Sequence, residues 1–197
     1  MMKTISSRRA EEIITKYSEW IDTVSNKYSI PAPAIKAILY VELIRIDVLD
    51  SVADIAVWSD LFAKKDSSTG YAQIFGSVGL KAVNFAVDSG LADYESIGLH
   101  TDHRLDVENH DDVRLVWDLL HTSPKANIEI GSINILCAAD EMTGRTDFEN
   151  FSENDYKLTF TRYNQNTREI TPYGEEAYAH YLRYRDNKPL NGGENIE

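Results

Sequence analysis

The sequence has little sulfur chemistry and no long apolar run. Its one cysteine, Cys137, excludes an intramolecular disulfide and lies in the apolar run INILCAA, so we expect a buried structural thiol rather than a nucleophile. No stretch reaches the roughly 18 apolar residues of a transmembrane helix, and residues 1–20 lack the apolar segment of a Sec signal. We therefore expect no membrane span, and a cytoplasmic location or export by a non-Sec route, as for an effector, a toxin or a phage protein.

Positive charge is also scarce. Lysine and arginine total 20 against 32 aspartates and glutamates, which gives a formal net charge of −12. This charge opposes non-specific binding to nucleic acids and to anionic membranes. It favours a neutral or cationic partner, such as a basic protein, or a ligand reached through a local pocket.

Several motifs with a known mechanism are missing. The sequence has no glycine-rich phosphate loop, no Gly-x-Ser-x-Gly elbow and no His-Glu-x-x-His pair. The segment TDHRLDVENHDD contains His103 and His110 and follows His100, but it offers no zinc spacing and no cysteine partner. We expect it to be a polar loop, and we expect no metal and no cofactor.

What the sequence does contain is helical periodicity. Apolar residues recur every three or four positions, and prolines and glycines fall where helices begin and end. The predicted fold class is all-α with at most a minor β element, in one domain over 1–188 followed by a disordered tail at 189–197. The predicted helices are 8–28, 33–50, 75–89, 109–121, 125–141, 152–165 and 173–185.

Glu42 interrupts one apolar helix face. In AIKAILYVELIRID it lies among residues such as Ile38, Leu39 and Ile46, where a leucine would pack. Pairing with Arg45 three residues later, or reaching solvent, would be the ordinary explanation. If the carboxyl is instead buried, desolvation raises its pKa.

Four short motifs follow one another along residues 28–165. They read YSIPAPAIKAILYVE, ending at Glu42; STGYAQIF, from Ser68; NIEIGSINIL, from Asn127; and FTRYNQ, with Tyr163 and Asn164. This ordered set resembles the lysozyme-like superfamily, most closely the goose-type lysozymes and soluble lytic transglycosylases. The chain departs from the family pattern in Leu43 after the glutamate, in Tyr71-Ala72 within the second motif, and in Asn166 in the fourth.

The resemblance implies a lysozyme-like helical domain that cleaves a β-1,4-linked amino-sugar polymer, with peptidoglycan as the default substrate and chitin or chitosan as others. Glu42 would be the general acid, because an apolar surround keeps a carboxyl protonated. Asp66 is the favoured second carboxylate among Asp47, Asp50, Asp54, Asp60 and Asp66. Tyr163 has the chemistry to bond to Glu42 or to substrate, with packing in the core as the alternative. Ser68 and Thr69 also have the chemistry to cap the following helix.

The predicted substrate-binding residues are Ser68, Thr69, Gly70, Tyr71, Gln73, Asn127, Tyr163 and Asn164. A chitosanase-like hydrolase and a non-catalytic lysozyme-like interaction protein remain the alternatives.

Overall fold

The computed structural model describes residues 5–46 and 68–189. Within these ranges the chain forms nine α-helices, one short 3-10 helix and one two-stranded hairpin. The mostly helical fold class expected from periodicity is therefore confirmed. None of the described helices is both long and apolar enough to cross a membrane.

The elements follow the chain in this order: α1 (Ser7–Lys16), α2 (Ser18–Tyr28), α3 (Ala32–Arg45), β1 (Ser68–Thr69), β2 (Ile74–Phe75), α5 (Gly76–Asp88), α6 (Tyr94–Ile97), α7 (His110–Thr122), α8 (Pro124–Thr143), η1 (Phe148–Asn150), α9 (Glu153–Asn164) and α10 (Pro172–Arg185).

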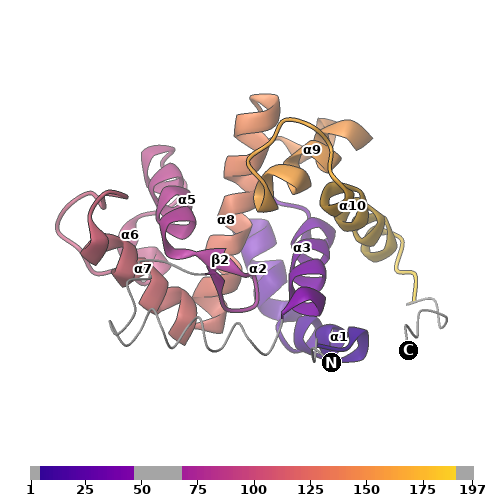
Figure 1. Cartoon of the computed structure of the whole chain (residues 1–197), viewed down its shortest axis with the longest axis horizontal. Coiled ribbons are helices and arrows are strands. Elements are labelled where there is room, and N and C mark those ends of the chain that lie inside the picture. The colour runs from indigo at the N-terminus through magenta and orange to yellow at the C-terminus, as the bar shows by residue number, and fades with distance from the viewer. Residues whose placement is uncertain (1–4, 47–67, 190–197) are drawn as a thin grey trace.

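Helix α8 runs through the middle of the molecule (Figure 1). It is buried over most of its length, as expected for a helix that is apolar on nearly every face. Helices α5 and α7 pack on one flank, and α2 and α9 contact the other. Helix α3 lies between α1 and α10 and is buried from Ala37 to Leu43 without a break, so Glu42 belongs to the core.

The predicted helix over 8–28 is wrong in one respect, because it is two helices. Tyr17 leaves the helical region, with φ −103° and ψ 12°, and separates α1 from α2. The break lets the two apolar faces meet different neighbours. Helix α1 packs against α3, whereas α2 also packs against α8.

The other predicted helices are present with shifts of one or two residues at most of their ends. Gly144 ends α8 with φ 66°, the left-handed conformation that favours glycine after a helix. Helix α3, predicted as 33–50, ends at Arg45, and residues 47–50 lie outside the described ranges. Three elements were not predicted, the hairpin, α6 and η1, because two-residue strands and helices of three or four residues carry no measurable period.

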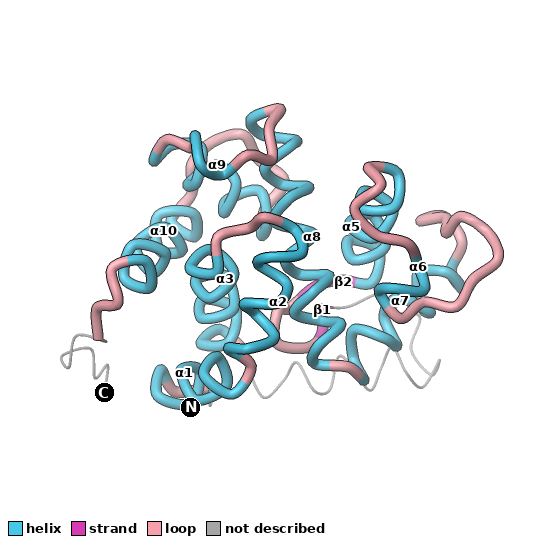
Figure 2. Tube along the Cα trace, turned by 180° about the vertical axis from the view of Figure 1, so that it is seen from behind, coloured by secondary structure: helices cyan, strands magenta, loops and turns pink. Residues whose placement is uncertain are grey.

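The hairpin strands contact α5 and α7. Viewed from behind, β1 and β2 lie beside α8, between α2 and the α5–α7 group (Figure 2). The described part of the polypeptide therefore places the second sequence motif next to the third, which lies on α8.

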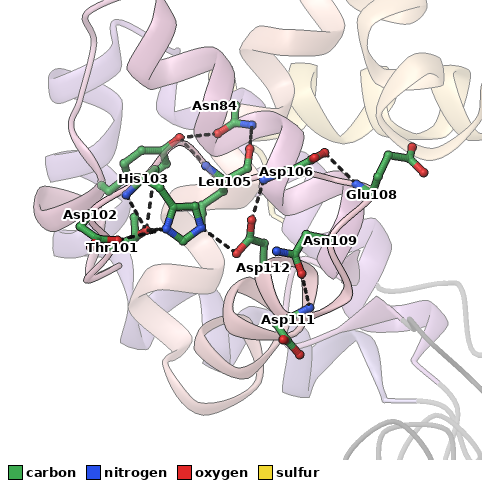
Figure 3. Close-up of polar contacts among 11 residues, drawn as sticks. Asn84, Thr101, Asp102, His103, Leu105, Asp106, Glu108, Asn109, Asp111 and Asp112 are labelled. Carbon is green, nitrogen blue, oxygen red and sulfur yellow. Dashed lines mark hydrogen bonds and ion pairs between the residues drawn. The ribbon is translucent and has the colours of Figure 1, made fainter.

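The histidine-rich segment between α6 and α7 is a hydrogen-bonded loop (Figure 3). The Nε2 atom of His103 lies 3.1 Å from Oδ1 of the buried Asp112, and its Nδ1 atom lies 3.2 Å from Oδ1 of Asp102. The other oxygen of Asp112 accepts from the amide of Asp106 at 2.8 Å. No group of metal ligands is gathered within the described residues, in this loop or elsewhere.

His103 should titrate above the ordinary histidine pKa. Both ring nitrogens face carboxylates, first that of Asp102 and then that of Asp112, and these favour the imidazolium and raise its pKa. A raised folded-state pKa adds stability that is complete below the unfolded value of 6.5 and is lost as pH rises through the folded value. NMR titration of the His103 ring should show this, and Asp112→Asn should lower the measured pKa. Asp111→Asn, at the neighbouring exposed carboxylate, is the matched control, and an equal effect of both variants would contradict the assignment.

Candidate functional site

The second sequence motif folds as a tight hairpin. Ser68 pairs with Phe75 and Thr69 with Ile74, and the chain reverses through Gly70–Gln73. Gly70 has φ 71°, and a Cβ there would lie 2.1 Å from Nδ2 of Asn127. Both the conformation and the close approach require glycine at this position.

Asn127 anchors this turn to α8. Its Oδ1 accepts from the amide of Ala72 at 2.8 Å, and its Nδ2 donates to the carbonyl oxygens of Thr69 at 3.0 Å and Leu120 at 3.3 Å. The side chain is fully buried. The structure therefore places this predicted substrate-binding residue beneath the turn, where it bonds to backbone.

Gly131 and Tyr163 also contact the hairpin turn, at Ala72. Gly131 lies one helical turn after Asn127, and a Cβ there would approach that of Ala72 to 2.7 Å. The hydroxyl of Tyr163, from α9, donates to the carbonyl of Ala72 at 2.8 Å. Of the two roles considered for Tyr163, a bond to Glu42 or substrate and packing in the core, the hydroxyl makes no bond to Glu42 and holds the hairpin turn.

Glu42 is 5% exposed, and its Oε1 accepts a hydrogen bond from the hydroxyl of Tyr173 at 2.5 Å. Burial raises the pKa of its carboxyl to about 7, against the opposing effects of the Tyr173 hydrogen bond and the charge of Arg45. The predicted rise by desolvation is confirmed. Tyr173 was not predicted, because it lies 131 residues further along the chain and no spacing connects the two.

Arg45 does not pair with Glu42. Its Nη2 lies 2.5 Å from Oε2 of Glu176, and its guanidinium lies 4.8 Å from the ring centroid of Tyr173. The ordinary explanation for a helical glutamate, an ion pair three residues along, is therefore wrong here. The Glu42 carboxyl stays in the core with a neutral hydrogen-bond donor.

Glu42 opens into a pocket of about 590 Å³ that we call the Glu42 pocket. It lies between α5, α8 and the end of α9, with the second hairpin strand at its edge. Its lining residues are Glu42, Gln73, Ile74, Phe75, Val78, Lys81, Phe85, Asn134, Cys137, Ala138, Asp140, Glu141, Arg162, Tyr163, Asn164, Gln165 and Asn166.

Four predicted site residues meet at this pocket: Glu42, Gln73, Tyr163 and Asn164. They come from three of the four sequence motifs, and Asn127 of the remaining motif supports the hairpin from below. Asp66, together with Asp47, Asp50, Asp54 and Asp60, lies outside the described residues.

The remaining predicted hairpin residues do not line the Glu42 pocket. Tyr71 packs against Tyr17 of α1, with ring centroids 5.7 Å apart. Ser68 donates to Oε1 of Gln73 at 3.2 Å, and Thr69 is buried with its hydroxyl 3.0 Å from Nδ1 of His121. The capping role considered for Ser68 and Thr69 is wrong, since they lie in β1 and α5 begins at Gly76 without a side-chain cap.

Phe75 is a pocket residue that sequence reasoning missed. Ile74 points into the core, so the alternation of a strand turns Phe75 outward, where it is 45% exposed. An exposed ring at a pocket wall can stack on the apolar face of a cyclic ligand. Beside it, Gln73 has φ 45° and donates from Nε2 to the carbonyl of Gly70 at 2.7 Å.

Cys137 lies in the pocket wall and is partly buried. Burial raises the pKa of its thiol to about 12, so it stays protonated and a poor nucleophile near neutral pH. Two more carboxylates line the pocket, those of Asp140 and Glu141, and Glu141 pairs with Arg162 at 2.5 Å.

This arrangement has the properties of a general acid. A carboxyl with a pKa of about 7 is protonated in much of the population at neutral pH. Because Tyr173 donates to Oε1, Oε2 is the oxygen on which the neutral carboxyl can carry its proton. No protein-family model, curated protein or solved structure matches the chain, so the site is interpreted from its own geometry.

Replacing Glu42 should stabilise the protein at alkaline pH. The folded-state pKa of about 7 exceeds the reference value of 4.5, so the contribution of this group is full below pH 4.5 and is lost as pH rises through 7. The loss amounts to roughly 3 kcal/mol. Urea unfolding near pH 4.5 and pH 8 should show Glu42→Gln gaining about this much on wild type at the higher pH. Glu108→Gln, at an exposed carboxylate, is the control, and parallel curves for wild type and Glu42→Gln would contradict the burial.

Asn127→Ala should destabilise the hairpin. The variant leaves the amide of Ala72 and the carbonyl of Thr69 without their buried partner, which costs about 2–3 kcal/mol. Asn164→Ala, at an exposed amide, should change the free energy of unfolding by less than about 0.5 kcal/mol. Urea unfolding measures both, and hydrogen exchange at Ala72 should accelerate in Asn127→Ala alone. Unchanged exchange at Ala72 would show that the turn does not depend on this amide.

Proposed function

We propose that the chain is a glycoside-cleaving enzyme, of lytic transglycosylase or muramidase type, with Glu42 as its general acid. The observation that carries the proposal is a buried carboxyl whose pKa is raised to about 7 and which opens into a pocket of about 590 Å³. Glycosidic cleavage needs a proton donor of this kind on the leaving oxygen.

The chemistry follows from the position of the proton. Glu42 gives its proton to the glycosidic oxygen as the bond from that oxygen to C1 breaks, and the bonding electrons remain on the oxygen. The N-acetyl group of an amino sugar can stabilise the positive charge that develops at C1, so the reaction does not require a second protein carboxylate. The Glu42 carboxylate then takes a proton from the attacking water or sugar hydroxyl.

A divergent lysozyme-like fold is part of the proposal. Its support is that the four ordered motifs meet around one hairpin: Glu42 and Gln73 line the pocket, Asn127 holds the turn, and Tyr163 bonds to it. In such an arrangement Tyr173 is a positioning residue, because it acts on Glu42 and does not line the pocket.

Pocket charge gives no preference for chitosan over peptidoglycan or chitin as the polymer. The lining holds two cations, Lys81 and Arg162, and two carboxylates besides Glu42, those of Asp140 and Glu141. With Glu42 protonated these charges cancel, although the whole chain carries −12. A balanced pocket does not select for a cationic polymer.

Soluble-product release from peptidoglycan, chitin and chitosan tests the proposal. Glu42→Gln should reduce the rate by at least about 100-fold, because a positioned general acid contributes that much or more. Glu108→Gln should match wild type. Equal release by wild type and Glu42→Gln on all three polymers would reject the enzyme and favour a non-catalytic interaction protein.

Tyr173→Phe separates positioning from folding. The Tyr173 hydroxyl lowers the pKa of Glu42, so its removal should raise that pKa and move the alkaline limb of the pH–rate profile upward. The rate at the optimum should fall, because the carboxyl loses its fixed orientation. An unmoved alkaline limb would contradict the role of this hydrogen bond.

A further inference from the structure

A second cavity lies away from Glu42. It has a volume of about 840 Å³ and shares no lining residue with the Glu42 pocket. Its walls come from the α2–α3 turn, the α8–α9 connection with η1, and one side of α9 and α10. We call it the aromatic cavity, and its role is separate from that of Glu42.

Five aromatic side chains line this cavity and contact one another. Tyr156 occupies the centre: its ring centroid lies 4.4 Å from that of Tyr181, 5.4 Å from Phe151 and 6.2 Å from Tyr178. Phe148 completes the set, 4.7 Å from Phe151. Phe151 and Tyr178 are partly exposed, so the cluster has an accessible edge.

The same rings already accept cations from the chain. Arg145 lies 5.4 Å from the centroid of Phe151, Lys157 lies 5.4 Å from Tyr178, and Arg185 lies 5.9 Å from Tyr181. These distances fall within the roughly 6 Å over which a ring face attracts a cation. Arg145 and Lys157 do not line the cavity, whereas Arg185 does.

Carboxylates outnumber cations in the cavity lining. Asp147, Glu149 and Glu153 face a single cation, Arg185, whose charge is paired with Asp186 at 2.8 Å. Asp147 bonds to Asn150, and Glu153 pairs with Lys157. Glu149 is exposed and forms no ion pair with any described residue, so it is the carboxylate available to a ligand.

We propose that the aromatic cavity binds an alkylammonium side chain, a lysine presented by a basic segment of a protein partner. The aromatic rings would pack against the methylene stem and hold the ammonium over a ring face, and Glu149 would pair with the charge. A chain of net charge −12 attracts such a segment at long range. A neutral sugar would use the rings but would gain nothing from the carboxylates.

The test is an NMR titration of the full chain, following the ring signals of Tyr178 and Tyr181. The probes are Nα-acetyl-lysine methylamide, its neutral analogue Nα-acetyl-norleucine methylamide, N-acetylglucosamine and a hexalysine peptide. We expect saturable shifts with the lysine probe, at least about 5-fold weaker binding of the norleucine probe, and tighter binding of hexalysine at the same signals.

Two variants locate the site. Glu149→Gln should lower the affinity for the lysine probe by about 3- to 10-fold. Tyr178→Leu should lower this affinity by a similar factor while the circular dichroism spectrum stays unchanged. Glu108→Gln, at an exposed carboxylate elsewhere, should bind like wild type. Glu42→Gln should also bind like wild type, so this result is independent of the glycosidase proposal.

Equal binding of the lysine and norleucine probes would overturn the proposal. An unchanged affinity of Glu149→Gln for the lysine probe would overturn it as well. Saturable shifts of the ring signals with N-acetylglucosamine, and none with the lysine probe, would identify the cavity as a sugar site. This result would also overturn the proposal.

Discussion

The candidate site depends on the close approach of a four-residue turn to the central helix. Asn127 bonds to the backbone at Thr69, just before the Gly70–Gln73 turn, and at Ala72 within it, and Gly131 leaves room for Ala72 one helical turn later. An amide at i and a glycine at i+4 share one helix face, so a single stretch of α8 provides both the bond and the space. These contacts fix the turn against α8. They thereby set the positions of Gln73 and Phe75 at the edge of the Glu42 pocket.

Burial is the stronger of two opposing effects at Glu42. The Tyr173 hydrogen bond and the Arg45 charge both favour the carboxylate, yet the pKa is raised to about 7. The outcome depends on where Arg45 lies. It pairs with Glu176 on α10, and the negative charge of Glu176 raises the pKa of Glu42 and so opposes the effect of Arg45. The α3–α10 contact therefore supplies both the hydroxyl that orients the carboxyl, from Tyr173, and the carboxylate that offsets the Arg45 charge, from Glu176.

Much of the fold could be predicted from the sequence, because the spacing of apolar residues and the prolines and glycines at helix ends are local properties. Pro124, Pro172 and Gly144 mark real helix boundaries, and the raised pKa of Glu42 followed from its apolar neighbours alone. The contact partners were harder to predict. Nothing local connects Glu42 to Tyr173 or directs Arg45 to Glu176. Asn127 was recognised as part of a motif, but its burial beneath the turn follows only from the packing of α8 against the hairpin.

Charge is distributed unevenly between the two cavities, and this decides what long-range attraction can do. The Glu42 pocket is balanced when Glu42 is protonated, so selection there depends on shape, ring stacking at Phe75 and hydrogen bonds. The aromatic cavity keeps a surplus of carboxylates and is where the overall charge of −12 acts in the same direction as the local field. Helix α10 contributes to both environments, with Tyr173 at its start beside Glu42 and Tyr181 in the aromatic cavity. Eight residues along a helix span about 12 Å, so α10 contacts the protonated acid of α3 near its start and lines the anionic cavity about two turns later.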